Sequence, residues 1–461
     1  MTLSSINIPS DLIPSDLADL YPAHLAHLQQ YYADAAMLAG CRGILIAAGD
    51  VHGCFLDDHH YPFVVNPHFK AWLPITDTPD SFVLFRTGET PRLLFNQPED
   101  YWHMKPADPT GFWVEHWEII PIPSVDDARQ YLGTTADLLF IGEATQLAAE
   151  WGITQINTTA ALDLLHYERA YKTPYEIACI WQANQIAVRG HHAAEGAFRL
   201  GHSEFEIAHT YLGAIAQREQ EAPYNAIVAL NEHCAVLHYQ FYQHQRFAET
   251  DRHALLIDGG ASFHGYAADI TRTYAYQPGL FGDLITQMDE QHLGVISDIK
   301  PGVSYATLHE QMHRRVGEVL KSSGIVNMPV DDMLATNLTF NFLPHGLGHF
   351  LGLQTHDVGG FQQSRQGETK AAPDKYPALR LTRDIENHQV FTIEPGLYFI
   401  PMLLKELKQG PHKAAINWGL IEQLLPCGGI RIEDNIAMID GAPVNLTRLA
   451  QQALLGQQQD R

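Results

Sequence analysis

Two aspartates, Asp258 and Asp269, lie where two short extended segments are expected to meet. Asp258 closes the apolar run LLID, and Asp269 follows a GG turn and the small-residue stretch GYAAD. This pattern predicts two strands of a hairpin-like unit, each presenting one carboxylate. Two carboxylates brought together repel each other. Either one of them is protonated, as in a catalytic dyad, or a divalent cation lies between them.

Three further ligand-type side chains follow in glycine-rich segments of the C-terminal half. His349 lies in HGLGHFLG, Glu394 in TIEPG and Glu433 in GGIRIEDN. Together with the two aspartates they make four carboxylates and one imidazole. This set has too many oxygens for a tetrahedral zinc site and suits a pair of hard divalent ions.

Each of these residues, taken alone, is more often structural than catalytic. Asp258 could cap a turn, His349 could be a buried hydrogen-bonded histidine, and Glu433 could pair with Arg431. Taken jointly, the residues favour a metal site, because each lies beside apolar or glycine residues that would otherwise leave its charge without compensation.

The order of the five ligand candidates resembles that of the metallopeptidases with the pita-bread fold, which include methionine aminopeptidase, aminopeptidase P and prolidase. The resemblance is greater to bacterial prolidase (Xaa-Pro dipeptidase) and the related organophosphorus acid anhydrolase, and it covers nearly the whole chain. It implies an α+β pita-bread (creatinase/aminopeptidase) catalytic domain. The stretches typical of this subgroup are LDDHHYPFVVNPHFKAW at 56–72, NEHCAVLHY at 231–239 and KYPALRLTR at 375–383.

The resemblance implies hydrolysis of Xaa-Pro dipeptides by a dinuclear metal centre with a bridging hydroxide. Asp258 would hold one metal, Asp269 and Glu433 would bridge both, and His349 and Glu394 would complete the second. Mn²⁺ is the expected ion, and cobalt or zinc could also support activity in vitro. A side activity on organophosphorus esters or fluorides is also implied, since a tetrahedral phosphorus centre resembles the peptide transition state.

The resemblance also implies catalytic residues around the metals. Glu394 would carry the proton to the leaving nitrogen. The imidazoles of His238, His345 and His356 would hydrogen-bond the substrate carbonyl or the developing tetrahedral oxygen. His345 could instead orient another ligand.

Four more residues are expected to bind the substrate. The resemblance places Tyr224 and Asp58 at the pocket for the N-terminal residue. Arg380 would bind the free carboxylate of a dipeptide through its planar fork of donors, and Arg431 is a second candidate. Arg380 could instead pair with Asp384 at the surface.

Two other functions stay open on sequence grounds. One is aminopeptidase P-type cleavage of longer peptides that have proline in second position. The other is a non-catalytic pita-bread protein that only binds partners. Such a protein need not keep its metal ligands, whereas all five are present in this chain.

Two motifs compete with the five-ligand site. HEQMH would place His309 and His313 on one helix face for zinc, with Glu310 as base, but the same run fits an amphipathic surface helix. We therefore expect HEQMH not to be the metal site. GLGHFLG at 346–352 lacks the glycine spacing and the following acidic residue of a dinucleotide-binding loop.

The N-terminal third is expected to be an α/β domain, residues 1–170. Residues 16–39 have helical periodicity, and apolar runs follow at 43–49, 81–88 and 136–143. Runs of this kind that alternate with helical stretches predict a central sheet.

A second domain is expected to start with the segment KTPYEIACI. Thr173 can cap a helix that has Pro174 at its first position and Glu176 three residues after the cap. The catalytic domain is then predicted over 171–443, followed by a glutamine-rich helical tail over 444–461.

Composition excludes several partners. A formal net charge of −24 with no basic run argues against nucleic acid. The N-terminus lacks a signal-peptide pattern, and no stretch approaches a membrane-spanning length. The 5 scattered cysteines fit reduced thiols in the cytoplasm. Family likeness favours a homodimer whose substrates are small dipeptides that end in proline.

Overall fold

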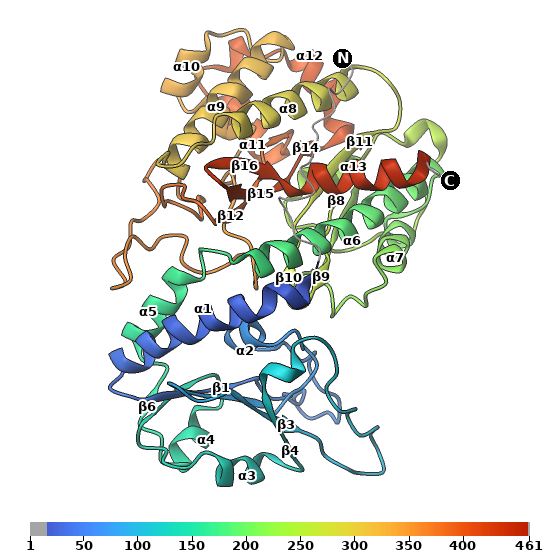
Figure 1. Ribbon diagram of the computed structural model, residues 1–461. Helices are drawn as coiled ribbons and strands as arrows, with labels where there is room; N and C mark the ends of the chain where they lie inside the picture. The colour runs from blue at the N-terminus through green and yellow to red at the C-terminus, as the bar shows by residue number, and fades with distance from the viewer. Residues whose placement is uncertain (1–15, 460–461) are drawn as a thin grey trace. The chain divides into compact units, whose positions relative to one another are not determined.

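The computed structural model describes residues 16–459 (Figure 1). The chain forms two compact units. The first extends to Cys179 and includes Phe263–Tyr266 and Gln362–Thr369, and the second contains Ile180–Ser262, Ala267–Phe361 and the chain from Lys370 onward. The expected absence of a signal peptide concerns residues 1–15, which lie outside the described range. Of the helices within 16–459, none has both the length and the apolar character that a membrane span requires.

The first unit is built on a 6-stranded sheet with the strand order β4-β3-β2-β1-β5-β6. The predicted runs at 43–49, 81–88 and 136–143 form β1, β2 and β5. Strand β1 is buried along its whole length and pairs antiparallel with β2 and parallel with β5. Its continuous apolar sequence is typical of a strand covered on both faces. The strands are β1 (Gly43–Ala47), β2 (Phe82–Arg86), β3 (Arg92–Asn96), β4 (Glu118–Ile122), β5 (Leu138–Ile141) and β6 (Gln155–Ile156).

Helices cover both faces of this sheet. Figure 1 shows α1 (Leu17–Leu38) and α2 (Pro67–Trp72) over one face, and α3 (Val125–Ala128) and α4 (Thr145–Glu150) over the other. Trp72 of α2 packs on Phe85 with 5.2 Å between the ring centroids. On the opposite face, Leu45 packs in a cluster with Trp151. Helix α5 (Thr159–Glu168) lies along α1.

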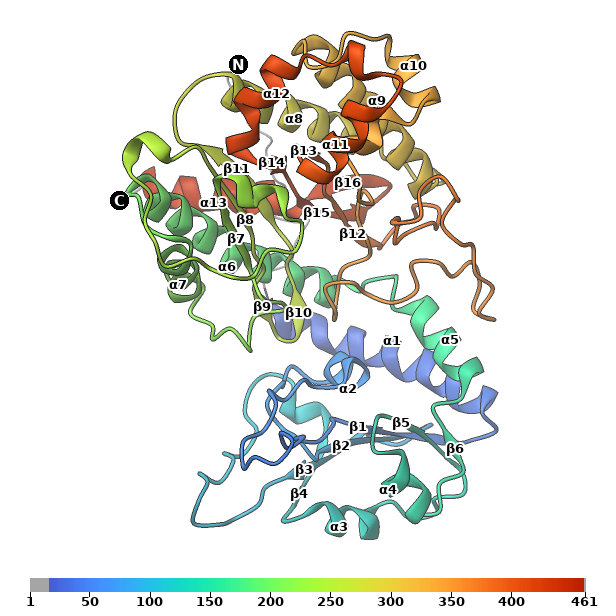
Figure 2. The ribbon, with the colours of Figure 1, turned by 180° about the vertical axis from the view of Figure 1, so that it is seen from behind.

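The second unit carries short strands between helices. Figure 2 shows these strands between α6 (Pro174–Arg199) and α7 (Glu204–Ile215) on one side and α8 (Leu280–Ser297) and α9 (Tyr305–Ser322) on the other. Three small sheets have the orders β11-β8-β7, β12-β15-β16 and β13-β14. The strands are β7 (Ile227–Leu230), β8 (Ala254–Asp258), β11 (Thr271–Ala275), β12 (Val390–Ile393), β13 (Gly396–Tyr398), β14 (Gly429–Arg431), β15 (Asp434–Ile439) and β16 (Ala442–Asn445). The helices are α7 (Glu204–Ile215), α8 (Leu280–Ser297), α9 (Tyr305–Ser322), α10 (Val330–Ala335), α11 (Pro401–Gln409), α12 (Trp418–Leu424) and α13 (Leu446–Gln459).

Capping boxes fix the starts of two long helices. Helix α6 (Pro174–Arg199) begins as predicted: the Thr173 amide donates to the Glu176 carboxylate at 2.8 Å, and the Glu176 amide donates to the Thr173 hydroxyl at 3.4 Å. Ser203 and Glu206 make the same pair of bonds at the start of α7. Each box satisfies amides that a helix start leaves without partners.

Candidate metal centre

The two aspartates meet at one end of the ladder between β8 and β11. Asp258 is the last residue of β8 and lies opposite Thr271, the first residue of β11, in the antiparallel register. Asp269 lies two residues before β11. The Tyr224 hydroxyl bonds to Oδ1 of both aspartates, at 2.8 Å to Asp258 and 2.5 Å to Asp269. The predicted two-strand arrangement therefore places both carboxylates at one site.

Glu433 joins this site from the segment between β14 and β15. Its backbone amide donates to the Thr271 carbonyl at 3.0 Å, and its Oε2 accepts from the Thr271 hydroxyl at 2.8 Å. The residue is only 2% exposed, and its Oε1 is buried without a hydrogen-bond partner among the described residues. A buried carboxylate oxygen without a partner is costly, so this atom indicates a missing ligand-type contact.

His349 and Glu394 reach the site through a second pairing of distant segments. The Thr392 amide donates to the His349 carbonyl at 2.9 Å, and the Glu394 amide donates to the Leu347 carbonyl at 2.8 Å. Close packing at Gly348 allows this approach, because a Cβ there would lie 2.4 Å from the Thr392 carbonyl oxygen. Gly348, which precedes His349 in HGLGH, therefore has no room for a side chain.

The imidazole of His349 has a defined orientation. Its Nδ1 lies 2.9 Å from the Phe350 carbonyl oxygen, to which it can only donate. When the ring is neutral, its lone pair is thus on Nε2, which lies 3.4 Å from Asp269 Oδ2 and 3.5 Å from Glu394 Oε1. An Nδ1–H bonded to a backbone carbonyl is the usual support of a histidine that binds metal through Nε2.

All five predicted ligands line one cavity of about 530 Å³. Ligand atoms of Asp269, His349 and Glu433 lie within 4.8 Å of one another and could hold an ion. Asp258 and Glu394 flank this group, one beside Asp269 and the other beside His349. The other predicted site residues on the cavity wall are His238, His345, His356, Arg380 and Arg431.

Burial and mutual repulsion oppose the simultaneous ionisation of these carboxyl groups. Burial, followed by repulsion from Asp269, Glu394 and Asp258, holds the pKa of Glu433 well above its usual value. Burial likewise raises the pKa of Glu394 to about 7 and raises that of Asp258. Asp269 differs: burial raises its pKa, but hydrogen bonds from His349 and Tyr224 outweigh burial and lower it.

The pKa of His349 also indicates that the site favours a positive charge. Burial lowers its pKa, yet the carboxylates of Asp269 and Glu394 outweigh burial and raise the pKa above the usual value. A divalent cation would neutralise the carboxylates directly. The donors are oxygens plus one imidazole nitrogen, which fits a hard divalent ion. The residues present therefore fit the metal centre that the sequence predicted.

Arg431 is buried, lines the cavity and is bonded to other groups of the site, while its predicted contact with substrate stays a prediction. It donates to Asp258 Oδ2 at 2.8 Å and to the Tyr398 hydroxyl at 3.0 Å. The alternative pairing of Arg431 with Glu433 is thus wrong. The Tyr398 hydroxyl in turn lies 2.9 Å from His345 Nε2, and His345 Nδ1 donates to the Gly346 carbonyl at 2.8 Å. Both nitrogens of His345 are therefore occupied, which favours an orienting role.

Tyr398 and Thr271 were not predicted from the sequence. Tyr398 follows Glu394 in EPGLY, and Thr271 follows Asp269 at the alternating position of a strand. These spacings were the only features of the sequence that could have indicated the two residues. Their roles become evident from the hydrogen bonds of Tyr398 with Arg431 and of Thr271 with Glu433, which the fold brings about.

The remaining predicted residues differ in their surroundings. The ring of His356 lies edge-on to that of His349, with 4.3 Å between centroids and an angle of 81°. Arg380 lines the cavity, and its alternative ion pair with Asp384 does not occur among the ion pairs of the described residues. Tyr224 binds the ligand carboxylates instead of presenting a free hydroxyl to substrate.

Asp58 belongs to the first unit. Its side chain is fully exposed, and the nearest charged partner is His59, with 3.4 Å between Oδ1 and Nδ1. Its substrate-binding role stays a prediction.

The histidines of HEQMH correct one interpretation. Helix α9 is amphipathic as expected, but His309 and His313 lie on its buried face, at 2% and 1% exposure, and not on the surface. Glu310 is on the exposed face. Periodicity did not reveal this, because an imidazole suits either face of a helix. Within the described residues the groups that could hold a metal do not include this pair.

Comparison with known proteins agrees with this geometry. Residues 178–440 match Metallopeptidase family M24, and residues 19–167 match the Xaa-Pro dipeptidase, N-terminal domain. An Xaa-Pro dipeptidase of Aeromonas hydrophila is 46% identical over 437 residues, covering 95% of this chain and 99% of the relative. One of Pseudoalteromonas atlantica is 44% identical over 437 residues, covering 94% and 98%.

Solved structures share the fold. Proline aminopeptidase P II from Yersinia pestis superposes with a TM-score of 0.68 at 22% identity, covering 92% of this chain and 96% of that one. The N-terminal α/β domain followed by a pita-bread catalytic domain, expected from the sequence, is thereby confirmed.

Proposed function

The chain belongs to metallopeptidase family M24, and from this premise we propose that it hydrolyses Xaa-Pro dipeptides with two divalent ions, which we assign as Mn²⁺. The proposal of substrate rests on relatives called Xaa-Pro dipeptidase that match nearly the whole chain. One observation carries the proposal of chemistry. Five ligand-type side chains line a single cavity, and the buried Oε1 of Glu433 has no partner among the described residues.

We assign the five ligands as the sequence suggested. Asp258 would hold one ion, Asp269 and Glu433 would serve both, and His349 and Glu394 would complete the second. The short approach of Asp269, His349 and Glu433 supports this assignment. Divalent ions held there supply the Lewis acidity that polarises the scissile carbonyl and activates the attacking water.

Residues of the chain keep the ligands in place. The Tyr224 hydroxyl fixes one oxygen of Asp258, and Arg431 fixes the other at 2.8 Å. The Thr271 hydroxyl orients Glu433 at 2.8 Å. Because Asp258, Asp269, Glu433 and His349 have hydrogen-bonded support, their geometry is set before substrate binds. Glu394, which also lines the cavity, is the residue we assign to carry the proton to the leaving nitrogen.

The substrate end of the cavity suits proline. An Xaa-Pro bond has no amide N–H, so the site needs no acceptor for it and can surround the ring with apolar groups. Leu237, Phe361 and Leu379 line the cavity beside the metal ligands. Arg380 on the same wall is the residue we assign to bind the free carboxylate.

We also propose that the chain forms a homodimer. The support is the exposure of three large apolar side chains of the first unit, with Phe55 at 88%, Leu56 at 91% and Met104 at 94%. Contact between two chains would cover such side chains if they lie together. Sedimentation at micromolar concentration should give the mass of a dimer, and a monomer at every concentration would contradict the proposal.

The activity can be tested on the purified chain after removal of metal with EDTA and reloading with Mn²⁺. We expect metal-dependent cleavage of Xaa-Pro dipeptides, with little cleavage of Xaa-Ala dipeptides or Xaa-Pro-Yaa tripeptides. Faster cleavage of the tripeptides would favour the aminopeptidase P alternative. Failure of the metal-loaded protein to cleave any Xaa-Pro bond would refute the proposal.

A further inference from the structure

Tyr376 is a buried residue inside an exposed loop that borders the metal cavity. Among residues 371–378 it alone is classed as buried, with 4% exposure. Within 371–378, all of which the structure describes, the one backbone amide that donates to a backbone carbonyl is that of Tyr376, and its acceptor is the nearby Pro373 carbonyl at 2.7 Å. A loop with few backbone bonds depends on side-chain packing for its order.

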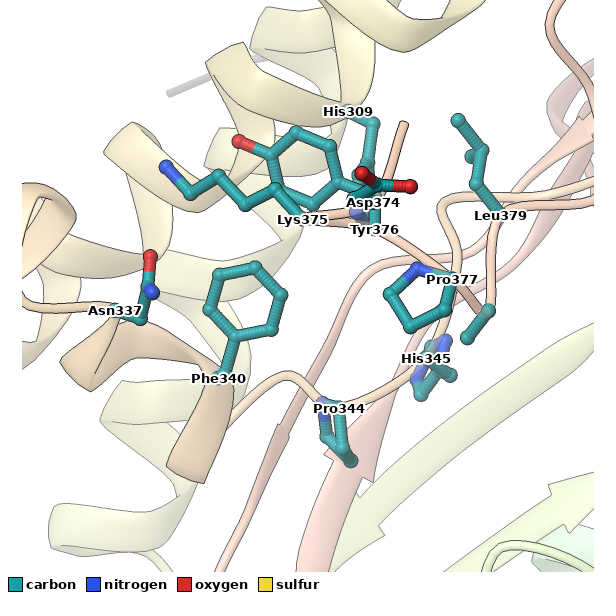
Figure 3. Close-up of a pocket in the computed structure, with 11 residues that line it drawn as sticks. His309, Asn337, Phe340, Pro344, His345, Asp374, Lys375, Tyr376, Pro377 and Leu379 are labelled. Atoms are coloured by element: carbon teal, nitrogen blue, oxygen red, sulfur yellow. The ribbon is translucent and has the colours of Figure 1, made fainter. Parts of the chain in front are cut away.

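The ring of Tyr376 lies in a socket of three aromatic side chains, which we call the tyrosine socket. His309 meets the ring edge-on at 4.5 Å between centroids and 82°. His313 and Phe340 stack on it, both at 5.5 Å between centroids and at 22° and 11°. Figure 3 shows Tyr376, Phe340 and His309 around one cavity, which has a volume of about 350 Å³.

The two histidines serve this socket as neutral rings. Burial lowers the pKa of His309 to about 2 and that of His313 to about 4. His313 Nδ1 bonds to the Thr339 hydroxyl at 3.0 Å, while His313 Nε2 and His309 Nδ1 are buried without partners in the described residues. The pair therefore contributes aromatic surface, and the HEQMH motif gains a role that needs no metal.

The socket is connected to the cavity wall that carries Arg380. The Leu379 amide donates to the Tyr376 carbonyl at 3.0 Å, which closes a turn between the socket and the wall. Leu379 and Leu381, on either side of Arg380, are both buried, at 2% and 1% exposure. Residues 377–379 border both the 350 Å³ cavity and the metal cavity.

Close backbone packing keeps this stretch from shifting independently. A Cβ on Gly346 would lie 2.8 Å from the Ala378 carbonyl oxygen, and one on Gly360 would lie 2.5 Å from the Arg380 carbonyl oxygen. The Thr382 amide donates to the Gly360 carbonyl at 3.0 Å. Arg380 is thus held between Thr382 on one side and Tyr376 on the other.

We propose that the tyrosine socket of His309, His313 and Phe340 holds Tyr376 so that Arg380 is positioned to bind the substrate's free carboxylate. Tyr376 is then a positioning residue that acts through Arg380. The inference rests on the proposed dipeptidase function and deepens it, because it names what sets the recognition of the substrate C-terminus. Without the ring, the loop samples conformations in which Arg380 is displaced, and only a fraction of molecules bind the carboxylate well.

The first test compares an Xaa-Pro dipeptide with its Xaa-Pro amide, which has no carboxylate to bind. Tyr376→Ala should raise KM and lower kcat/KM for the dipeptide by about tenfold to hundredfold, with little change for the amide. Tyr376→Phe should rescue activity to within about threefold of the parent, because it keeps the ring and loses only a hydroxyl that lies 3.4 Å from Glu310.

Phe198→Ala is the matched control for loss of a buried ring. Phe198 is 2% exposed, packs on Tyr276 at 5.6 Å between centroids and is not among the residues that line the metal cavity. It should lower Tm and leave the ratio of dipeptide to amide hydrolysis unchanged. A Tyr376→Ala protein that changes Tm but not this ratio would overturn the inference.

The second test is a double-mutant cycle with Arg380→Ala. If Tyr376 acts through Arg380, Tyr376→Ala in the Arg380→Ala background should change dipeptide kcat/KM by less than about threefold. Additive losses would overturn the inference while leaving the dipeptidase function intact. A parent protein inactive on every Xaa-Pro dipeptide would overturn the proposed function, and the role of the socket with it.

Discussion

Glu433→Gln should stabilise the metal-free protein, although it removes a predicted metal ligand. In the metal-free site the carboxyl of Glu433 is 2% exposed, its Oε1 has no partner among the described residues, and three other carboxylates surround it. Glutamine keeps an oxygen that can accept from the Thr271 hydroxyl. It also adds an NH₂ group that can donate to a neighbouring carboxylate. The variant thus removes a buried acid and gains a hydrogen bond.

The magnitude follows from the unpartnered oxygen. Leaving a buried polar atom without a partner costs about 1–3 kcal/mol, so metal-free Glu433→Gln should exceed the metal-free parent by about that free energy of unfolding. In the presence of metal, the parent should be more stable than Glu433→Gln. Ions that bind only the folded parent stabilise it by about 2.7 kcal/mol at a free concentration of about 100 Kd, and the variant loses most of this gain.

The pH dependence has a defined sign. The pKa of Glu433 is raised in the folded state, so the folded protein binds the proton that the unfolded chain has already released. The contribution of Glu433 to metal-free stability should therefore be fully present below the usual glutamate pKa and be lost as the pH rises through the raised value. Glu394, with its pKa raised to about 7, adds a fall of the same sign up to about that pH. The stability of metal-free Glu433→Gln should fall less steeply with rising pH, because the substitution removes the contribution of Glu433 and keeps that of Glu394.

The assay is urea unfolding of EDTA-treated protein from about pH 5 to about pH 8, repeated with Mn²⁺. Glu422→Gln, an exposed glutamate of α12, is the control and should change neither stability nor its pH dependence. A metal-free parent that is more stable than Glu433→Gln across the whole range would refute the interpretation of Glu433 as a buried carboxylate that needs a cation.

Three further predictions concern buried charged or aromatic groups of the second unit. Arg431→Met should destabilise the protein by about 3–5 kcal/mol in urea unfolding, because Asp258 loses its buried cation; a change below about 1 kcal/mol would contradict this. Glu204→Gln should lower the free energy of unfolding by about 1–3 kcal/mol. The fully buried Glu204 carboxylate accepts hydrogen bonds from two backbone amides, an imidazole and a tyrosine hydroxyl, and the NH₂ group of glutamine cannot accept any of them. His309→Ala with His313→Ala should lower stability by about 2–4 kcal/mol and keep full metal content; metal loss with unchanged circular dichroism would make HEQMH the metal site.

Long apolar runs and local caps allowed much of the fold to be predicted. The run GILIAAG gave β1, and Thr173 with Glu176 gave the start of α6, because both signals are local in sequence. In the sheet of the first unit, strands β3, β4 and β6 were not predicted. β4 contains Pro121 and is only partly buried, and β6 has 2 residues, so neither has the alternation or length that marks a strand.

The site was predictable as a set of ligands and not as a network. Glycine-rich contexts singled out His349 and Glu433, since close backbone packing leaves a local signature. The bonds that orient the ligands join segments distant in sequence, such as Arg431 to Asp258 and Tyr398 to His345. Such partners depend on tertiary packing, which sequence spacing does not encode.

The most direct test of the central claim is to measure bound metal and turnover together in the parent and in Asp269→Asn. Asp269 is the proposed bridging ligand that lies closest to both His349 and the Tyr224 hydroxyl. We predict two divalent ions per chain and cleavage of Xaa-Pro dipeptides in the parent, and loss of bound metal and of turnover in the variant with circular dichroism unchanged. Near-normal turnover in Asp269→Asn would contradict the dinuclear site.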